Sequence, residues 1–377
     1  MTYMKKHAGN MSPFWRRFDR RLAIRACLLG FQAFCCIGLF VNRGIFDGST
    51  VQGPVKILVL YSYFETESTS TCEKIMKRTN LATFLRTGVL EGQHISYVFT
   101  LGGNLPDAFE FYSSIGLTPP FGNDILPRFA NVQLRTPVRS DVADLCHHAH
   151  AFKNVSRTEQ YSHVVFMNDG VRGPFEQRPP RITLRSIREV PSWIHDHLIL
   201  LHSEPHIGAV GSVLSCELTL HLQGWFVLLR TPLFSKHVHI FEETCDVNAW
   251  SDAINKETAF SDAILRDGLK LGTYFPVKVI VGQEQRTSIE PKLNSCMNPL
   301  TAFLQLNGQN ATVDLHNLRF LKVGGGFYRQ NILTIATKGA VSTFTSDALG
   351  VDHTNYYCFR DTKMAKQYRI ISALGSS

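Results

Sequence analysis

Strand-like apolar runs alternate with helical patterns over more than half of the chain, and this alternation most constrains the fold. Short apolar runs predict strands at residues 56–61, 95–101, 131–135, 164–167, 207–213 and 221–229. Apolar residues spaced three or four apart predict helices at residues 72–87, 141–152, 192–201 and 255–268. Strands that alternate with helices favour a mostly parallel sheet flanked by helices on both faces, so the sequence predicts an α/β fold.

The predicted α/β domain occupies residues 55–282 and follows a short Gly-rich stem at 43–54. From residue 283 onward the apolar pattern weakens. The β-like runs that remain lie around Phe303, Phe320 and Thr334. We therefore interpret residues 283–377 as a β-rich C-terminal extension of the domain.

Residues 22–42 predict a single transmembrane helix. The part from 26 to 41 carries no charge, and residues 22–25, with a snorkelling Arg25, extend it to about the length that spans a bilayer. Basic residues precede this run: Lys5, Lys6, Arg16, Arg17, Arg20 and Arg21. The positive-inside rule places residues 1–21 in the cytoplasm and the remainder of the chain in the lumen.

Two alternatives compete with this signal-anchor. A cleaved signal peptide needs small residues at its cleavage site, which Phe40-Val41-Asn42-Arg43 does not provide. A buried core helix is compatible with the shortness of the uncharged run.

Six cysteines lie in the predicted lumenal part of the chain. They are Cys72, Cys146, Cys216, Cys245, Cys296 and Cys358. An even number fits an oxidising compartment, in which we expect some of them to form disulfides. Their connectivity is left open.

The net charge of +8 comes largely from the predicted cytosolic tail. The predicted lumenal part is only mildly basic and carries no dense Lys/Arg run with interleaved aromatics, so we expect no nucleic-acid partner.

Polar residues follow the predicted strand 164–167 at its carboxyl end. Asn168 and Asp169 come first, and Arg172 lies three residues further on. Open α/β sheets bind ligands at this edge, where a carboxylate can hold a divalent cation and an arginine can clamp a phosphate. These groups suit a diphosphate–metal ligand such as a nucleotide sugar. The alternative is an exposed turn, the commonest role of Asn-Asp-Gly.

Two acids in the predicted helix 255–268 are candidates for a general base. Glu257 lies in the first predicted turn, where the alternative is a favourable interaction with the helix dipole. For Asp262 the alternative is an acid on the outer helix face. Alternation along the predicted strand 221–229 puts His221, Gln223 and Trp225 on one face, where they would line a sugar pocket or form part of the core.

Several motifs in the region from Lys56 to about Pro276 resemble those of a glycosyltransferase family with a GT-A-like nucleotide-sugar fold. This family occurs in microbial eukaryotes and is related to bacterial polysaccharide transferases. The matching residues are Cys72-Glu73, Asn80-Leu81, Asn168 to Phe175, Val210-Gly211, Cys216, His221 to Phe226, Glu257, Ser261 and Ile264 to Gly268. Their order and spacing agree with the family pattern.

Together with the predicted signal-anchor, the resemblance implies a type II membrane glycosyltransferase of the Golgi, or alternatively of the endoplasmic reticulum. It would move a sugar from a nucleotide-sugar donor to a glycan or glycoconjugate acceptor. Asp169 would hold a Mn or Mg ion, and Asp141 would also bind the donor. Many enzymes of this fold carry two carboxylates at the metal position, whereas here Asn168 precedes Asp169. The alternative is therefore a lumenal sugar-binding protein of the same fold without catalytic turnover.

The predicted orientation can be tested by glycan occupancy. Two sequons lie in the predicted lumenal part, at Asn154 and Asn310, and a third at Asn10 lies in the predicted cytosolic tail. We expect endoglycosidase-sensitive glycan on Asn154 or Asn310, and no change in mobility for Asn10→Gln. Glycan on Asn10 alone would contradict the orientation.

Overall fold

The computed structural model describes residues 55–67, 69–137, 144–174, 190–216, 218–243, 245, 250–275, 279–285 and 320–322. All of them belong to one compact unit, Gly53–Ser377. The predicted tail, membrane helix and stem lie outside these residues, as do Asp141, Asn310 and most of the C-terminal extension. Among the described helices, none combines the length and the apolar character needed to cross a bilayer.

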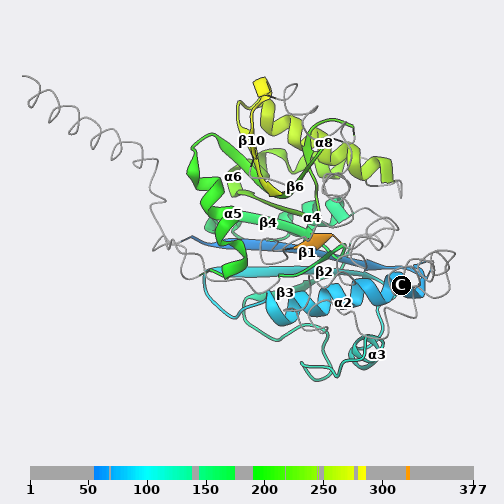
Figure 1. Cartoon of the computed structure of the whole chain (residues 1–377). Coiled ribbons are helices and arrows are strands. Elements are labelled where there is room, and N and C mark those ends of the chain that lie inside the picture. The colour runs from blue at the N-terminus through cyan, green and yellow to red at the C-terminus, as the bar shows by residue number, and fades with distance from the viewer. Residues whose placement is uncertain are drawn as a thin grey trace, which may run out of the picture. The chain divides into compact units, whose positions relative to one another are not determined.

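A mostly parallel sheet forms the centre of this unit, and eight of its strands run in the order β10-β9-β6-β8-β4-β1-β2-β3 (Figure 1). Their bounds are β1 Ile57–Glu65, β2 Ile95–Gly103, β3 Val132–Arg135, β4 His163–Asn168, β6 Ile207–Ser215, β8 Phe226–Arg230, β9 Lys270–Phe275 and β10 Val279–Val281. The short β7, His221–Leu222, pairs with β6. Strands β3, β2, β1 and β4 are mutually parallel, whereas β8 is antiparallel to both of its neighbours.

Helices cover both faces of the sheet. One face packs against α2 Thr71–Thr87, α3 Ala108–Ser113 and α5 Ser192–Ser203. The other packs against α4 Asp144–Lys153, α6 Thr231–His237, α7 His239–Glu242 and α8 Trp250–Arg266. Figure 1 shows α2 and α3 on the side of the sheet opposite to α4 and α8. Because side chains alternate along a strand, β1 sends Val59 and Tyr61 into the first core and Leu58 and Leu60 into the second. This explains why β1 is a continuous apolar run.

Two predicted elements differ from the structure. The predicted strand 221–229 is divided into β7 and β8, because Gly224 lies in the connection between them and only residues 226–230 pair with β4. The helix predicted to begin at residue 255 begins at Trp250, where the buried Ile254 extends its apolar face. Glu257 is therefore in the middle of α8, and the interpretation of this residue as a first-turn acid is wrong.

A short part of the predicted extension packs against the core. Leu321 and Lys322 form β11, which is antiparallel to β5, Val171–Arg172. The neighbouring Phe320 is buried, with its ring centroid 5.5 Å from that of Trp193 and 4.9 Å from that of Phe226. Residues 320–322 thus contact the segment that follows the Asn168-Asp169 motif.

Two histidines make an acid-sensitive contact at the start of β4. His202 Nε2 lies 3.0 Å from His163 Nε2, and His163 Nδ1 lies 2.8 Å from Ser162 Oγ. Burial, together with the nearby His202 and Arg230, lowers the pKa of His163 to about 3, and burial together with Arg230 lowers that of His202 to about 4. Both rings therefore remain neutral in the folded protein at pH values at which an unfolded histidine binds a proton.

We expect the folded protein to lose stability as the pH falls from about 6.5, the ordinary histidine pKa, toward 4. Above that range the contribution of the neutral pair is fully present. His202→Gln removes one of the two titrating rings. The decrease in the free energy of unfolding per pH unit should therefore be smaller than in wild type, by up to about 1.4 kcal/mol. Urea titrations between pH 7.5 and 4.5 measure this slope, and the exposed His206 provides the control variant His206→Gln. The same dependence of the free energy of unfolding on pH in wild type, His202→Gln and His206→Gln would contradict the prediction.

Candidate functional site

The candidate site lies where β1 and β4 end side by side. These strands are parallel, with Ser62 opposite Asn168, so their carboxyl ends meet at one edge of the sheet. The amide of Asp169 donates a hydrogen bond of 3.0 Å to the carbonyl of Ser62. The pairing thus continues through the first residue after β4, at the sheet edge where α/β proteins bind ligands.

Asp169 is buried at this edge, with 8% of its surface exposed. Its Oδ2 accepts a 2.9 Å hydrogen bond from the backbone amide of Phe64 and lies 3.5 Å from Lys77 Nζ. Burial raises the pKa of Asp169, and the charge of Lys77 and the bond from Phe64 offset only part of this effect. The expectation of an exposed turn is therefore wrong for Asp169, because β1 extends to Glu65 and encloses its carboxylate.

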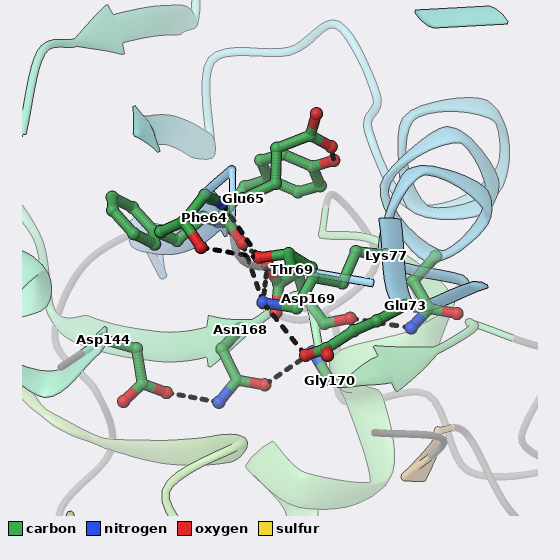
Figure 2. A network of polar contacts seen from close by, with 12 residues as sticks. Phe64, Glu65, Thr69, Glu73, Lys77, Asp144, Asn168, Asp169 and Gly170 are labelled. Carbon is green, nitrogen blue, oxygen red and sulfur yellow. Dashed lines mark hydrogen bonds and ion pairs between the residues drawn. The ribbon is translucent and has the colours of Figure 1, made fainter. Parts of the chain in front are cut away.

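Lys77 is a central residue of the site that the sequence analysis missed. Figure 2 shows its ammonium group between Phe64, Glu73 and Asp169. Lys77 Nζ donates a hydrogen bond of 2.7 Å to the carbonyl of Phe64 and lies 3.8 Å from Glu73 Oε1. Burial alone would lower the pKa of Lys77, but the two carboxylates raise it above its ordinary value. The sequence signal was the Glu73–Lys77 spacing of four residues on the helix after β1.

Arg172 is connected to this network through Asn80. It is 3% exposed, and its Nε donates a 2.8 Å hydrogen bond to Asn80 Oδ1. Asn80 Nδ2 in turn donates a 2.7 Å bond to the carbonyl of Asp169. Burial lowers the pKa of Arg172 to about 10. Arg172 thus holds the backbone of the motif through Asn80, and its contact with a phosphate stays a prediction.

Asn168 connects the motif to α4. Its Nδ2 donates a hydrogen bond to Asp144 Oδ2, and its Oδ1 accepts a 2.9 Å bond from the amide of Gly170 (Figure 2). The second bond is the local contact of an Asx turn, so the turn interpretation of this sequence holds for Asn168. Asp144 Oδ1 also accepts a 3.0 Å bond from the amide of Leu145.

A buried ion pair fixes the end of β1. Arg78 donates hydrogen bonds to Glu65 through Nε at 2.9 Å and through Nη2 at 2.5 Å, and Tyr63 Oη donates to Glu65 Oε2 at 2.7 Å. Burial would raise the pKa of Glu65, but the bonds from Arg78 and Tyr63 lower it instead. Glu65 is thus the last residue of β1, four residues beyond the end of the strand predicted at 56–61.

Glu257 belongs to a second polar cluster, on α8. Its Oε1 accepts a 2.6 Å hydrogen bond from the amide of Gly224, and its Oε2 lies 3.5 Å from His221 Nε2. A Cβ added to Gly224 would lie 2.7 Å from Glu257 Oε1 and 3.2 Å from Leu145 Cδ2. Gly224 is therefore flanked by Glu257 and by Leu145, the residue that follows Asp144, so the start of α4 connects the two polar clusters.

The three residues predicted to line a sugar pocket are buried. His221 is 0%, Gln223 3% and Trp225 3% exposed. Trp225 Nε1 donates a 2.7 Å bond to Gln223 Oε1, whereas His221 Nδ1 is 2.6 Å from the carbonyl of Thr219. These contacts favour the interpretation that the three side chains are part of the core over the prediction that they line an open sugar pocket. Asp262 is only partly buried, so it does not lie on a fully exposed face.

A groove of about 500 Å³ opens beside the carboxyl ends of β2 and β3. Its walls include Leu101, Asp107, Leu126, Arg128, Leu134 and Arg135. Because β2 pairs with β1 as far as Gly103, the groove begins one strand away from the Asp169 site.

The oxygens around Asp169 do not form a set of ligands for a divalent ion in this arrangement. Lys77 lies against Asp169 Oδ2 and the Phe64 carbonyl, and both oxygens of Asp144 accept hydrogen bonds. Within the described part of the chain, no three His, Cys, Asp or Glu side chains converge as a metal site. The residues around Asp169 therefore do not fit the predicted metal in this arrangement.

Comparisons with known proteins give no family assignment. No protein-family model matches the chain, and no curated protein matches it. Among solved structures, the chain is similar to a 4-diphosphocytidyl-2C-methyl-D-erythritol synthase from Anaerococcus prevotii DSM 20548. The identity is 11% and the TM-score 0.30, over 63% of this chain and 98% of that one. This similarity is too weak to support a functional argument.

The burial of Asp169 predicts a measurable role in stability. Asp169→Asn keeps an acceptor for the Phe64 amide but removes the charge beside Lys77, so we expect a loss of about 1–3 kcal/mol in the free energy of unfolding. Asp124, which pairs with Arg128 at the surface, provides the control variant Asp124→Asn with a change below about 0.5 kcal/mol. Chemical denaturation measures both variants. A loss no larger than that of the control would contradict the buried ion pair.

Proposed function

We propose that the protein is a nucleotide-sugar-dependent glycosyltransferase with a GT-A-like domain. It would transfer a sugar to the hydroxyl group of a glycan or glycoconjugate. The observation that carries the proposal is that two polar clusters are connected through Asp144 and Leu145 at the start of α4. One contains Asp169, Asn168 and Lys77 at the carboxyl ends of β1 and β4, and the other contains the carboxylate of Glu257 beside Gly224.

The first cluster suits the donor. Asn168 and Asp169 offer an amide and a carboxylate to the ribose hydroxyls of a nucleotide sugar, and the neighbouring Lys77 offers a positive charge to its diphosphate. The groove beside β2 and β3 has room for the nucleoside part. A donor-binding role remains part of the proposal for Arg172, whose guanidinium suits a phosphate, and for Asp141, on the strength of the family resemblance.

The second cluster suits the acceptor. In an inverting transfer, the acceptor oxygen attacks the anomeric carbon, the bond to the diphosphate breaks, and the hydroxyl proton passes to a base. Glu257 would be that base. Because the carbonyl of Thr219 can only accept, His221 Nδ1 carries a hydrogen, and His221 Nε2 faces Glu257 Oε2 at 3.5 Å. His221 thus holds a fixed position beside the proposed base.

The proposed setting is a single-pass type II protein of the Golgi membrane, with the endoplasmic reticulum as the alternative. The support comes from the predicted helix at 22–42 and from the disulfide Cys146–Cys245, which favours an oxidising compartment. The glycan test described above examines this orientation.

A second candidate function is sugar binding without turnover. The observation that favours it is that Asp169 Oδ2 and Arg172 Nε already have partners within the protein. A screen of nucleotide sugars for release of nucleoside diphosphate separates the two functions. Release from one donor class supports the transferase, and binding of a nucleotide sugar without any release supports the binding protein.

Glu257→Gln tests the proposed base. The amide oxygen keeps the hydrogen bond from Gly224 but has no basicity, so turnover should fall by roughly 10²-fold or more with donor binding little changed. The matched variant Asp262→Asn, on the same helix, should retain turnover within about threefold. Near-normal turnover of Glu257→Gln would reject the role of Glu257, and a large loss in Asp262→Asn alone would transfer it to that residue.

A further inference from the structure

Three oxygen atoms from separate segments surround the ammonium group of Lys77. They are the carbonyl of Phe64 at 2.7 Å, Asp169 Oδ2 at 3.5 Å and Glu73 Oε1 at 3.8 Å. Carbonyl and carboxylate oxygens are the ligands that hard divalent cations prefer. Lys77 Nζ therefore occupies the position in which these oxygens would bind a divalent cation. Its charge offsets part of the charge of the two carboxylates.

The position of Lys77 is fixed by its neighbours on α2. Arg78 binds Glu65 at the end of β1, and Asn80 donates to the carbonyl of Asp169. These two contacts hold α2 against both strands of the site. The Lys77 side chain itself is 18% exposed, so its charge is partly desolvated but remains accessible to a ligand.

We propose that Lys77 is the resident cation of this site and takes the place of a divalent metal in holding the donor diphosphate. The inference rests on the proposed function. A lysine ammonium is a compact charge with three donors, which suits a phosphate oxygen. Lys77 Nζ donates to the Phe64 carbonyl, and its other hydrogens are available to Asp169, Glu73 or a bound phosphate. Donor binding is therefore independent of divalent metal.

The first experiment measures Mn²⁺ binding to the ligand-free full chain by electron paramagnetic resonance. Wild type should show no Mn²⁺ site that depends on Asp169. Lys77→Met removes the charge at similar length and should create one such site, which Asp169→Asn should abolish in the same background. Lys74→Met, three residues earlier on α2, is the matched control and should behave like wild type. An Asp169-dependent Mn²⁺ site in wild type, or none in Lys77→Met, would overturn the inference.

The second experiment measures binding of inorganic pyrophosphate by calorimetry with chelator present. Wild type and Lys74→Met should bind, Lys77→Met should bind roughly 30-fold more weakly or worse, and Lys77→Arg should retain most of the affinity. Binding by wild type only after addition of Mn²⁺ would contradict the inference alone. An absence of binding in both conditions would contradict the inference and the proposed diphosphate site together, and wild-type affinity in Lys77→Met would exclude Lys77 from the site.

Discussion

The parallel pairing of β1 with β4 is the constraint on which the site depends. Its register places Ser62 opposite Asn168, so the Asp169 amide reaches the Ser62 carbonyl and the Asp169 carboxylate reaches the Phe64 amide. A shift of one residue would move every side chain of β4 to the other face of the sheet. The position of the carboxylate thus follows from backbone pairing that the two apolar cores enforce.

The surrounding elements fix this edge from both sides. On one side, α2 is held by the Glu65–Arg78 ion pair and by Asn80, so Lys77 cannot move far from Asp169. On the other side, Asn168 binds Asp144 at the start of α4, whose next residue flanks Gly224. The same contacts that stabilise the sheet edge therefore connect the proposed donor and acceptor groups through the start of α4.

Most of the fold could be predicted from the sequence because a buried parallel sheet has a strong apolar pattern. The runs that became β1, β2, β4 and β6 each follow a polar residue, and α8 shows clear apolar periodicity. The short elements could not be predicted in this way. Strands β5 and β11, each of two residues, form only because distant segments meet, and β7 separates from β8 through the local backbone at Gly224.

The site was predictable only in part, for a related reason. Its strand end could be located because Asn168 and Asp169 directly follow an apolar run. The burial of Asp169 and the contact with Lys77 depend on how far β1 extends and on how α2 docks, which no local pattern encodes. The buried contacts of His221 and Arg172 likewise arise from tertiary packing.

The most direct test of the account is a crystal structure of the protein with a bound nucleoside diphosphate. The account predicts that the diphosphate lies at the carboxyl ends of β1 and β4, with a phosphate oxygen within hydrogen-bonding distance of Lys77 Nζ. A nucleoside diphosphate bound elsewhere, or one that leaves the contacts of Lys77 and Asp169 without any phosphate nearby, would contradict it.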